Sequence, residues 1–277
     1  MVSQNAQKII IGAASLSVFA LIWELIAILV VVSLGADLEW ETILTAIQEG
    51  NSFYLPRFSF VVAAFFNAVQ TTVFFVDIGI SMSHFLFGAA CALILGIPIG
   101  MIMGWFPFLD KAISPIVELF RPIPPLAWIP FAILWFHLAP NSPGFIIFMG
   151  MIFPIILSTY SGFKNVSKIY VEAAKVLGSV SNVKLIRYIA VPAASPMILS
   201  GIRTSMGVGW MCLAASEMFG VSNTGIGYKL WFYFGILDMT NVVVCMLTLG
   251  LIGLLLDLLF NYLLHNRLLK WQKGTVI

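Results

Sequence analysis

Three carboxylates lie inside apolar stretches of the chain, where a charge is costly unless it is paired or hydrated. They are Glu24, Glu217 and Asp257. Such residues predict either an internal ion pair or the wall of a polar pathway. Glu217 lies at the expected outer end of its apolar stretch, so an external gate and a structural pair both stay open. For Asp257 the sequence suggests no partner.

Side chains that could perform catalysis are scattered. Three histidines lie near the ends of apolar runs, which favours packing or interfacial roles over metal binding: His84, His137 and His265. Three cysteines lie in apolar stretches without CxxC spacing: Cys91, Cys212 and Cys245. The sequence contains no HExxH or GxSxG motif and no GxxxxGK[ST] phosphate loop. We therefore expect no catalytic residue, no bound metal and no cofactor, so this chain is not expected to be an enzyme.

Membrane helices must hold these residues. Of 277 residues, 61% are hydrophobic and 9% are charged, whereas a soluble domain has about 25% charged residues. A helix needs roughly 20 apolar residues to cross a bilayer. Six runs meet this length: 9–34, 82–106, 113–137, 144–161, 195–217 and 241–264. Residues 58–76 are interrupted by polar side chains and are expected to form an interfacial helix.

The fold class is therefore all-α, a polytopic membrane protein with about six transmembrane helices. We expect a single transmembrane domain over 1–277, divided into an N-terminal span and external loop (1–80), a core (81–265) and a tail (266–277). No internal repeat is evident. The net charge of +2 is too small to favour nucleic-acid binding.

The basic residues predict how the chain is oriented in the cell membrane. Ten of them fall on the side of the two termini: Lys8, Lys111, Lys164, Lys168, Lys175, Lys184, Arg187, Arg267, Lys270 and Lys273. Two fall on the opposite side, Arg57 and Lys229. Because cytoplasmic loops carry the excess of Lys and Arg, both termini and the loop 162–194 are expected to be cytoplasmic.

A proline-rich stretch follows Arg121. Pro122, Pro124 and Pro125 occupy three of four positions and rule out regular helix there, so non-helical backbone is expected at or near membrane depth. A pathway or gate and a structural helix-entry turn both remain open. Arg121 suits either an anion or a lipid headgroup. Trp135, farther along the same span, suits packing or stacking on a substrate.

The loop 162–194 contains a stretch suited to docking. A short helix with Glu172, Ala173, Ala174 and Lys175 has little side-chain bulk, and Gly178 permits a sharp turn. We call Glu172–Gly178 the docking segment. A second amphipathic stretch, 183–190, is expected before the fifth span. A loop lying on the membrane surface is the alternative.

Glycines recur every four residues in the second span, at Gly96, Gly100 and Gly104. This spacing places them on one helix face, where another helix can approach closely. Packing within the bundle is favoured over a sliding surface.

The docking segment, with its Glu-Ala-Ala-x-x-x-Gly pattern followed by Ile189-Ala-Val-Pro192, resembles the EAA loop of inner-membrane permeases of binding-protein-dependent ABC importers. Three further stretches are similar to the nitrate, taurine and sulfonate branch of that family: Gly96–Gly100, Arg121–Pro130 and Ala214–Gly220. One departure is the spacing from Gly178 to Pro192, which is one residue longer than in the family pattern. It leaves the contacts of the second amphipathic stretch open.

The resemblance implies a function and partners. Two permease chains would pair, most simply as a homodimer, and two cytoplasmic ATP-binding subunits would dock on the loops and bind the ATP. An extracytoplasmic binding protein would deliver the substrate. Taurine or an alkanesulfonate is the preferred cargo, with nitrate, bicarbonate and a cofactor precursor as alternatives. An ATP-independent carrier is the competing class, but the few intramembrane acids form no relay.

Overall fold

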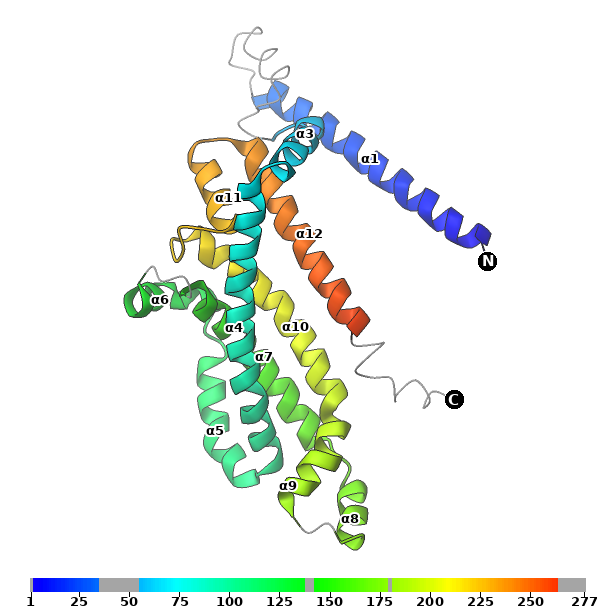
Figure 1. Ribbon diagram of the computed structural model, residues 1–277, viewed down its shortest axis with the longest axis vertical. Helices are drawn as coiled ribbons and strands as arrows, with labels where there is room; N and C mark the ends of the chain where they lie inside the picture. The colour runs from blue at the N-terminus through cyan, green and yellow to red at the C-terminus, as the bar shows by residue number, and fades with distance from the viewer. Residues whose placement is uncertain (1, 35–54, 138–141, 179–180, 264–277) are drawn as a thin grey trace. The chain divides into compact units, whose positions relative to one another are not determined.

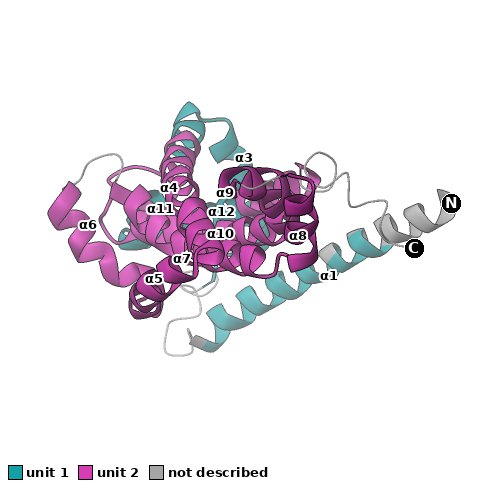
Figure 2. Cartoon of the chain, turned by 90° about the horizontal axis from the view of Figure 1, so that it is seen from below, with its two compact units in different colours: residues 1–77, 229–249 teal, residues 78–228, 250–277 magenta. Residues whose placement is uncertain are grey.

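The computed structural model describes residues 2–34, 55–137, 142–178 and 181–263, and the regular elements within these ranges are all helices (Figure 1). The tail 266–277 and the external-loop residues 35–54 lie outside the described residues. The chain divides into two compact units, residues 1–77 with 229–249 and residues 78–228 with 250–277 (Figure 2). An all-α membrane fold, as expected, is confirmed.

The first unit contains α1 (Val2–Leu34) and α3 (Phe58–Val69). Trp23 Nε1 donates to the carbonyl of Pro56 at 3.0 Å, and Glu24 pairs with Arg57 at 2.6 Å. Ser59 Oγ also donates to Glu24, at 3.0 Å. The carboxylate in the expected first span is therefore neutralised by the segment that leads into α3.

The second span begins earlier than the sequence suggested. Helix α4 (Thr72–Trp105) starts ten residues before the expected boundary, and α3 ends at Val69. The expected interfacial helix over 58–76 was therefore too long, because its last residues belong to α4. The break falls at Gln70 and Thr71, where Thr71 Oγ1 turns back to the carbonyl of Ala68 at 2.7 Å.

The core of the second unit forms around α7 (Ser142–Lys164), which packs extensively against α10 (Val191–Met218). Its inward-facing side chains are fully buried: Ile146, Ile147, Met151 and Ile155. The glycines of α4 also meet α7. A Cβ on Gly96 would lie 2.9 Å from Ile155 Cγ2, and one on Gly100 would lie 2.5 Å from the carbonyl of Ile156. These contacts are the bundle packing that the glycine spacing favours.

The expected third span, 113–137, is not one continuous helix. It consists of α5 (Pro107–Phe120), a short 3-10 turn, η1 (Pro125–Trp128), and α6 (Ile129–Phe136). The two halves meet at an angle of 86°. The prolines cause the break, because each removes a backbone donor and excludes helical geometry from the residue before it.

The amphipathic stretch expected over 183–190 and the fifth span expected from 195 lie in one helical segment. After α8 (Lys168–Val176), the chain is helical from Asn182 to Met218 without a break, over 37 residues. This stretch comprises α9 (Asn182–Leu185), a π-helical segment, η2 (Ile186–Ala190), and α10. Pro192 lies just after the π-helical segment and Pro196 lies inside α10, and neither ends the helix.

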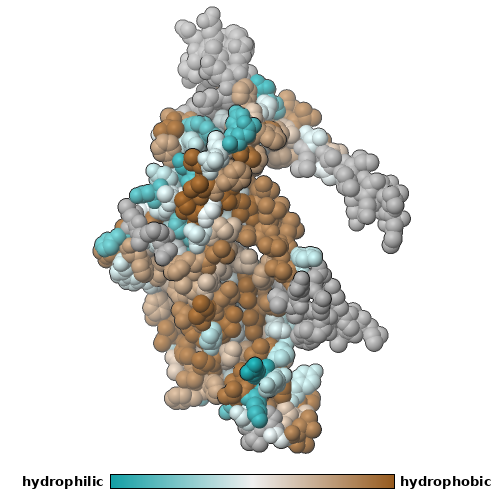
Figure 3. Space-filling model, viewed as in Figure 1, coloured by the Kyte–Doolittle hydropathy of each residue, from teal (hydrophilic) through white to brown (hydrophobic). Residues whose placement is uncertain are grey.

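The remaining helices are α11 (Ile226–Gly235) and α12 (Met239–Leu263). Within the described ranges, four helices are long and apolar enough to cross a membrane, and the bent α5–α6 pair would be a fifth. In α1 the described apolar stretch covers Ser17–Ser33. The number of six spans stays a prediction. Apolar residues dominate the visible flanks of these helices (Figure 3).

Candidate functional site

The docking segment lies mainly on α8, at the same end of the ribbon as α9 (Figure 1). Glu172, Ala173 and Lys175 are exposed. Gly178 has a φ of +90° and donates its N–H to the carbonyl of Lys175 at 3.0 Å. A Cβ built on Gly178 would meet nothing within 4 Å. The glycine is therefore required by backbone conformation and not by lack of space.

A groove of about 480 Å³ lies between α8 and the N-terminal part of the helical stretch 182–218. We call it the α8 groove. Its lining is mostly apolar and comes from both elements: Tyr170, Ala173, Ala174, Leu177, Tyr188, Ile189, Pro192 and Ala193. Val176 and Leu177 are each 87% exposed. Apolar side chains this exposed are typical of a surface that binds a protein partner or a membrane.

The proline-rich bend positions its residues in different surroundings. Arg121 caps the end of α5 and is exposed, as are Pro124 and, farther on, Trp135, whereas Pro125 is half-buried. Trp135 packs its ring against Phe131 and Phe145. It also lines an apolar groove of about 360 Å³ between α4, α5 and α7, to which Arg121, Pro124 and Pro125 do not contribute. The structure does not gather these four residues into one site.

Glu217 is fully buried at the end of α10, and both of its carboxylate oxygens are engaged. Oε1 lies 2.9 Å from Nδ1 of His84, and Oε2 accepts hydrogen bonds from Ser81 Oγ and the N–H of Gly227, each at 2.9 Å. Ser81 Oγ in turn accepts the N–H of Ile226 at 2.9 Å. The carboxylate thus joins α4, the end of α10 and the start of α11.

Two glycines make room for this carboxylate. Gly225 has a φ of +104°, and a Cβ there would collide with the Glu217 carboxylate. A Cβ on Gly227 would lie 2.7 Å from the carbonyl of Ala214. Sequence reasoning missed His84 and Ser81 as partners, although their three-residue separation puts them on one helix face. This geometry is that of a satisfied buried group.

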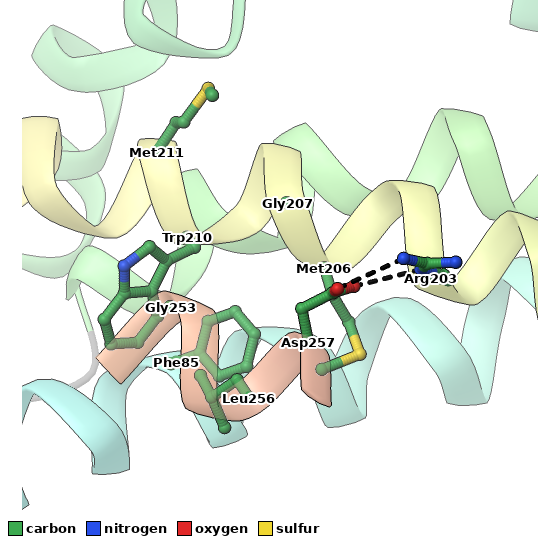
Figure 4. Close-up of a pocket in the computed structure, with 9 residues that line it drawn as sticks. All are labelled: Phe85, Arg203, Met206, Gly207, Trp210, Met211, Gly253, Leu256 and Asp257. Atoms are coloured by element: carbon green, nitrogen blue, oxygen red, sulfur yellow. Dashed lines mark hydrogen bonds and ion pairs between the residues drawn. The ribbon is translucent and has the colours of Figure 1, made fainter. Parts of the chain in front are cut away.

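Asp257, for which the sequence suggested no partner, forms an ion pair with Arg203. Arg203 donates from Nε to Oδ1 at 3.0 Å and from Nη2 to Oδ2 at 3.1 Å (Figure 4). Asn261 Nδ2 also donates to Oδ2, at 3.0 Å. A signal for this pair was present, because the apolar run of α12 contains one acid and that of α10 contains one base.

Comparisons with known proteins agree with this architecture. Residues 96–267 match the family model described as the inner membrane component of binding-protein-dependent transport systems. A putative ABC transporter permease protein of Methanocaldococcus jannaschii is 38% identical over 84% of this chain and 88% of its own length. The taurine transport system permease protein TauC of Escherichia coli K12 is 31% identical, covering 69% of each chain.

Two relatives from Synechocystis have other anions in their names. The nitrate import permease protein NrtB is 32% identical over 68% of each chain, and the bicarbonate transport system permease protein CmpB is 34% identical over 64% of this chain and 62% of its own length. A solved structure of the methionine ABC transporter MetNI, in an inward-facing conformation, has a TM-score of 0.54. It is 18% identical over 68% of this chain and 95% of that chain. That likeness concerns the fold.

The protein is therefore an ABC transporter permease, a multi-pass membrane component of a transport system. The chain belongs to the family of binding-protein-dependent transport system inner membrane components, in the branch whose members include nitrate and taurine permeases.

Proposed function

We propose that this chain is the permease subunit of an ATP-driven importer for a small anion, with taurine or an alkanesulfonate as the preferred cargo. Relatives named for taurine, nitrate and bicarbonate transport support the anion class. Nitrate, bicarbonate and a cofactor precursor are the alternatives within the same class. ATP hydrolysis belongs to a separate subunit, because the sequence has no phosphate loop.

The observation that carries the proposal is the α8 groove with its open apolar rim. In this scheme two ATP-binding subunits dock there, on two identical permease chains, and an external protein delivers the anion. Ala173 and Ala174 allow close approach, Glu172 and Lys175 make polar contacts, and Gly178 forms the bend. Closure of the ATP-binding subunits would move α8 together with the N-terminal part of the helical stretch 182–218. This movement would convert the permease between its inward-open and outward-open states.

The orientation follows from this arrangement. Docking of ATP-binding subunits requires α8 to be cytoplasmic, and six crossings would then put both termini on the same side as α8. Within the membrane we propose Arg121, Pro124, Pro125 and Trp135 as residues of a pathway or gate near the bend. Glu217 supports the outer end of α10 in this scheme, because all of its acceptor contacts are internal.

The test is to recover the partners of the tagged chain from its native host in mild detergent. We expect a P-loop ATPase to copurify and its hydrolysis to rise with one anion and the matching binding protein. Ala173→Trp fills the α8 groove and should release the ATPase. Ala112→Trp, at an exposed alanine of α5, is the matched control and should retain it. A well-folded chain that recovers no ATPase would overturn the proposal.

A further inference from the structure

One face of α10 differs from the other exposed faces of the membrane helices. Ser200, Arg203, Thr204 and Gly207 follow one another at helical spacing and are all exposed. The exposed face of α12, in contrast, carries leucines: Leu251, Leu254, Leu255, Leu258 and Leu259. Lipid tails suit the leucines, whereas polar side chains at membrane depth face protein or a water-filled cavity. The two faces therefore meet different surroundings.

Arg203 is the charged group on this polar face, and its side chain is 48% exposed while that of Asp257 is 45% exposed. The ion pair uses Nε and one side of the guanidinium. An arginine has five N–H donors in a planar fork. Within the described residues, the pair with Asp257 is the one hydrogen-bonded contact of this guanidinium, so its outer edge keeps donors for a further acceptor.

A cavity of about 270 Å³ adjoins the pair, between α10, α12 and α4. In Figure 4 the pair lies at one end, and Trp210 lies toward the other, with Phe85 and Leu256 between them. Apart from Arg203 and Asp257, the lining side chains lack a charge. The cavity holds several times the volume of one water, about 30 Å³. An oxyanion with a short apolar body matches this division into an end with free guanidinium donors, formed by the ion pair, and an apolar end.

We propose that Arg203 binds the oxyanion group of the transported molecule, and that the neighbouring cavity takes the apolar body of that molecule. This inference rests on the proposed function and narrows its preferred cargo, taurine or an alkanesulfonate, to alkanesulfonates or similar oxyanions with a short apolar chain, because the chain of taurine ends in an ammonium group. Asp257 orients the guanidinium and lowers its net charge, which keeps the anion from being held too tightly to leave. Bidentate acceptance by a sulfonate suits the planar fork better than it would suit a lysine.

The phosphate of an anionic lipid presents the same oxygens to Arg203. Two features favour the transported anion: the cavity is small, at about 270 Å³, and the polar face extends beyond Arg203 along α10. The test also covers an anionic lipid as the ligand of Arg203, because such a lipid would compete with butanesulfonate for the site.

The test uses the complete transporter, with its ATP-binding subunits and binding protein, in vesicles and nanodiscs of phosphatidylcholine. Uptake of labelled taurine, butanesulfonate and nitrate by the wild type is measured first. Absence of ATP-dependent uptake of all three would count against the proposed function. Binding of butanesulfonate to the nanodisc complex, without ATP or binding protein, is measured separately and reports on the site alone.

Opposite effects are expected from the two partners of the ion pair. Arg203→Gln should weaken butanesulfonate binding about tenfold or more, because it removes a charge-assisted pair of hydrogen bonds. Asp257→Asn should strengthen binding severalfold, because it removes the competing negative charge. Lys111→Gln, which removes an exposed positive charge on α5, should leave binding unchanged.

Two results would overturn the inference. If the ion pair serves only to hold α10 to α12, both substitutions should lower thermal stability while neither changes the affinity for butanesulfonate. If the site holds lipid, phosphatidylglycerol in the nanodisc should abolish butanesulfonate binding, and this lipid should copurify with the wild type but not with Arg203→Gln. Retained butanesulfonate binding in phosphatidylglycerol nanodiscs, together with the opposite signs, supports the inference.

Discussion

Nδ1 of His84 lies 2.9 Å from Oε1 of Glu217, although the two residues are 133 positions apart. Their side chains are 3% and 0% exposed. Nδ1 and Oε1 are within hydrogen-bond distance of each other, and a protonated Nδ1 donates to the carboxylate. Ser81 and the N–H of Gly227 complete the shell of Glu217. The C-terminal end of α10 is therefore fixed to α4 and to the start of α11 by one carboxylate.

Removing one partner of this cluster should destabilise the protein strongly. His84→Ala leaves Glu217 buried with one contact fewer, and we expect a loss of about 3 kcal/mol in the free energy of unfolding. Glu217→Gln keeps the shape and removes the charge, so it should cost less. Thermal unfolding of the purified chain in detergent measures both. A His84→Ala protein as stable as the wild type would show that the cluster contributes little.

Gly178→Ala should impair coupling to the ATPase. Its positive φ costs an alanine about 1–2 kcal/mol locally, with no steric clash to add. We expect substrate uptake to fall relative to ATP hydrolysis in reconstituted vesicles.

Gly220→Ala is the matched control for that experiment. Gly220 has a φ of +79° and equally open surroundings, but it lies outside the docking segment. It should suffer the same backbone strain and still keep the wild-type ratio of substrate uptake to ATP hydrolysis. An equal fall of this ratio in both variants would attribute the effect to strain alone.

Gly100→Ala should weaken the packing of α4 on α7. Its Cβ would lie 2.5 Å from the carbonyl of Ile156 and 2.7 Å from Thr159 Cβ, and overpacking of this kind costs about 1–3 kcal/mol. Gly79→Ala in the same helix meets no neighbour within 4 Å. It should leave the melting temperature unchanged or raise it, since alanine favours helix by up to about 1 kcal/mol. Differential scanning fluorimetry of the two variants compares them directly.

Arg57→Ala should destabilise the contact between α1 and α3. It leaves Glu24 with the hydrogen bonds from Ser59 but without its cation. Double substitution with Glu24→Gln should recover part of the loss, because the unpaired charge is then gone. The measurement is the rate at which a protease cleaves α1 in vesicles, which should rise when the contact between α1 and α3 is weakened. Additive effects of the two substitutions would indicate that the pair is not coupled.

Much of the fold was predictable, because apolar run length and proline chemistry act locally. The break after Arg121 follows from three prolines, and the spacing of Gly96, Gly100 and Gly104 indicates a close helix contact. The start of α4 at Thr72 was not predictable from hydropathy alone. The helix includes Asp77, a polar residue that hydropathy places outside a span. Whether such a residue can lie within a helix depends on contacts with residues distant in sequence.

The candidate site was predictable only where neighbours in sequence are neighbours in space. The docking segment is the second half of one short helix, α8, and the two residues that follow it, ending at Gly178. The sequence pattern alone therefore locates it. The partners of Glu217 and Asp257 come from other helices, and only tertiary packing reveals them. The continuity of residues 182–218 was missed because Pro192 and Pro196 suggest a boundary, whereas the helix continues through both of them after the π-helical segment.

That continuity links the two ends of the helix thermodynamically. Tyr188 and Pro192 line the α8 groove, and Arg203 lies on the same uninterrupted helix. If an anion at Arg203 changes the affinity of the groove for its partner by some factor, the partner must change the affinity for the anion by the same factor. The affinity of the groove for its partner and the affinity of Arg203 for the anion would then share one coupling free energy, measurable by binding at either end.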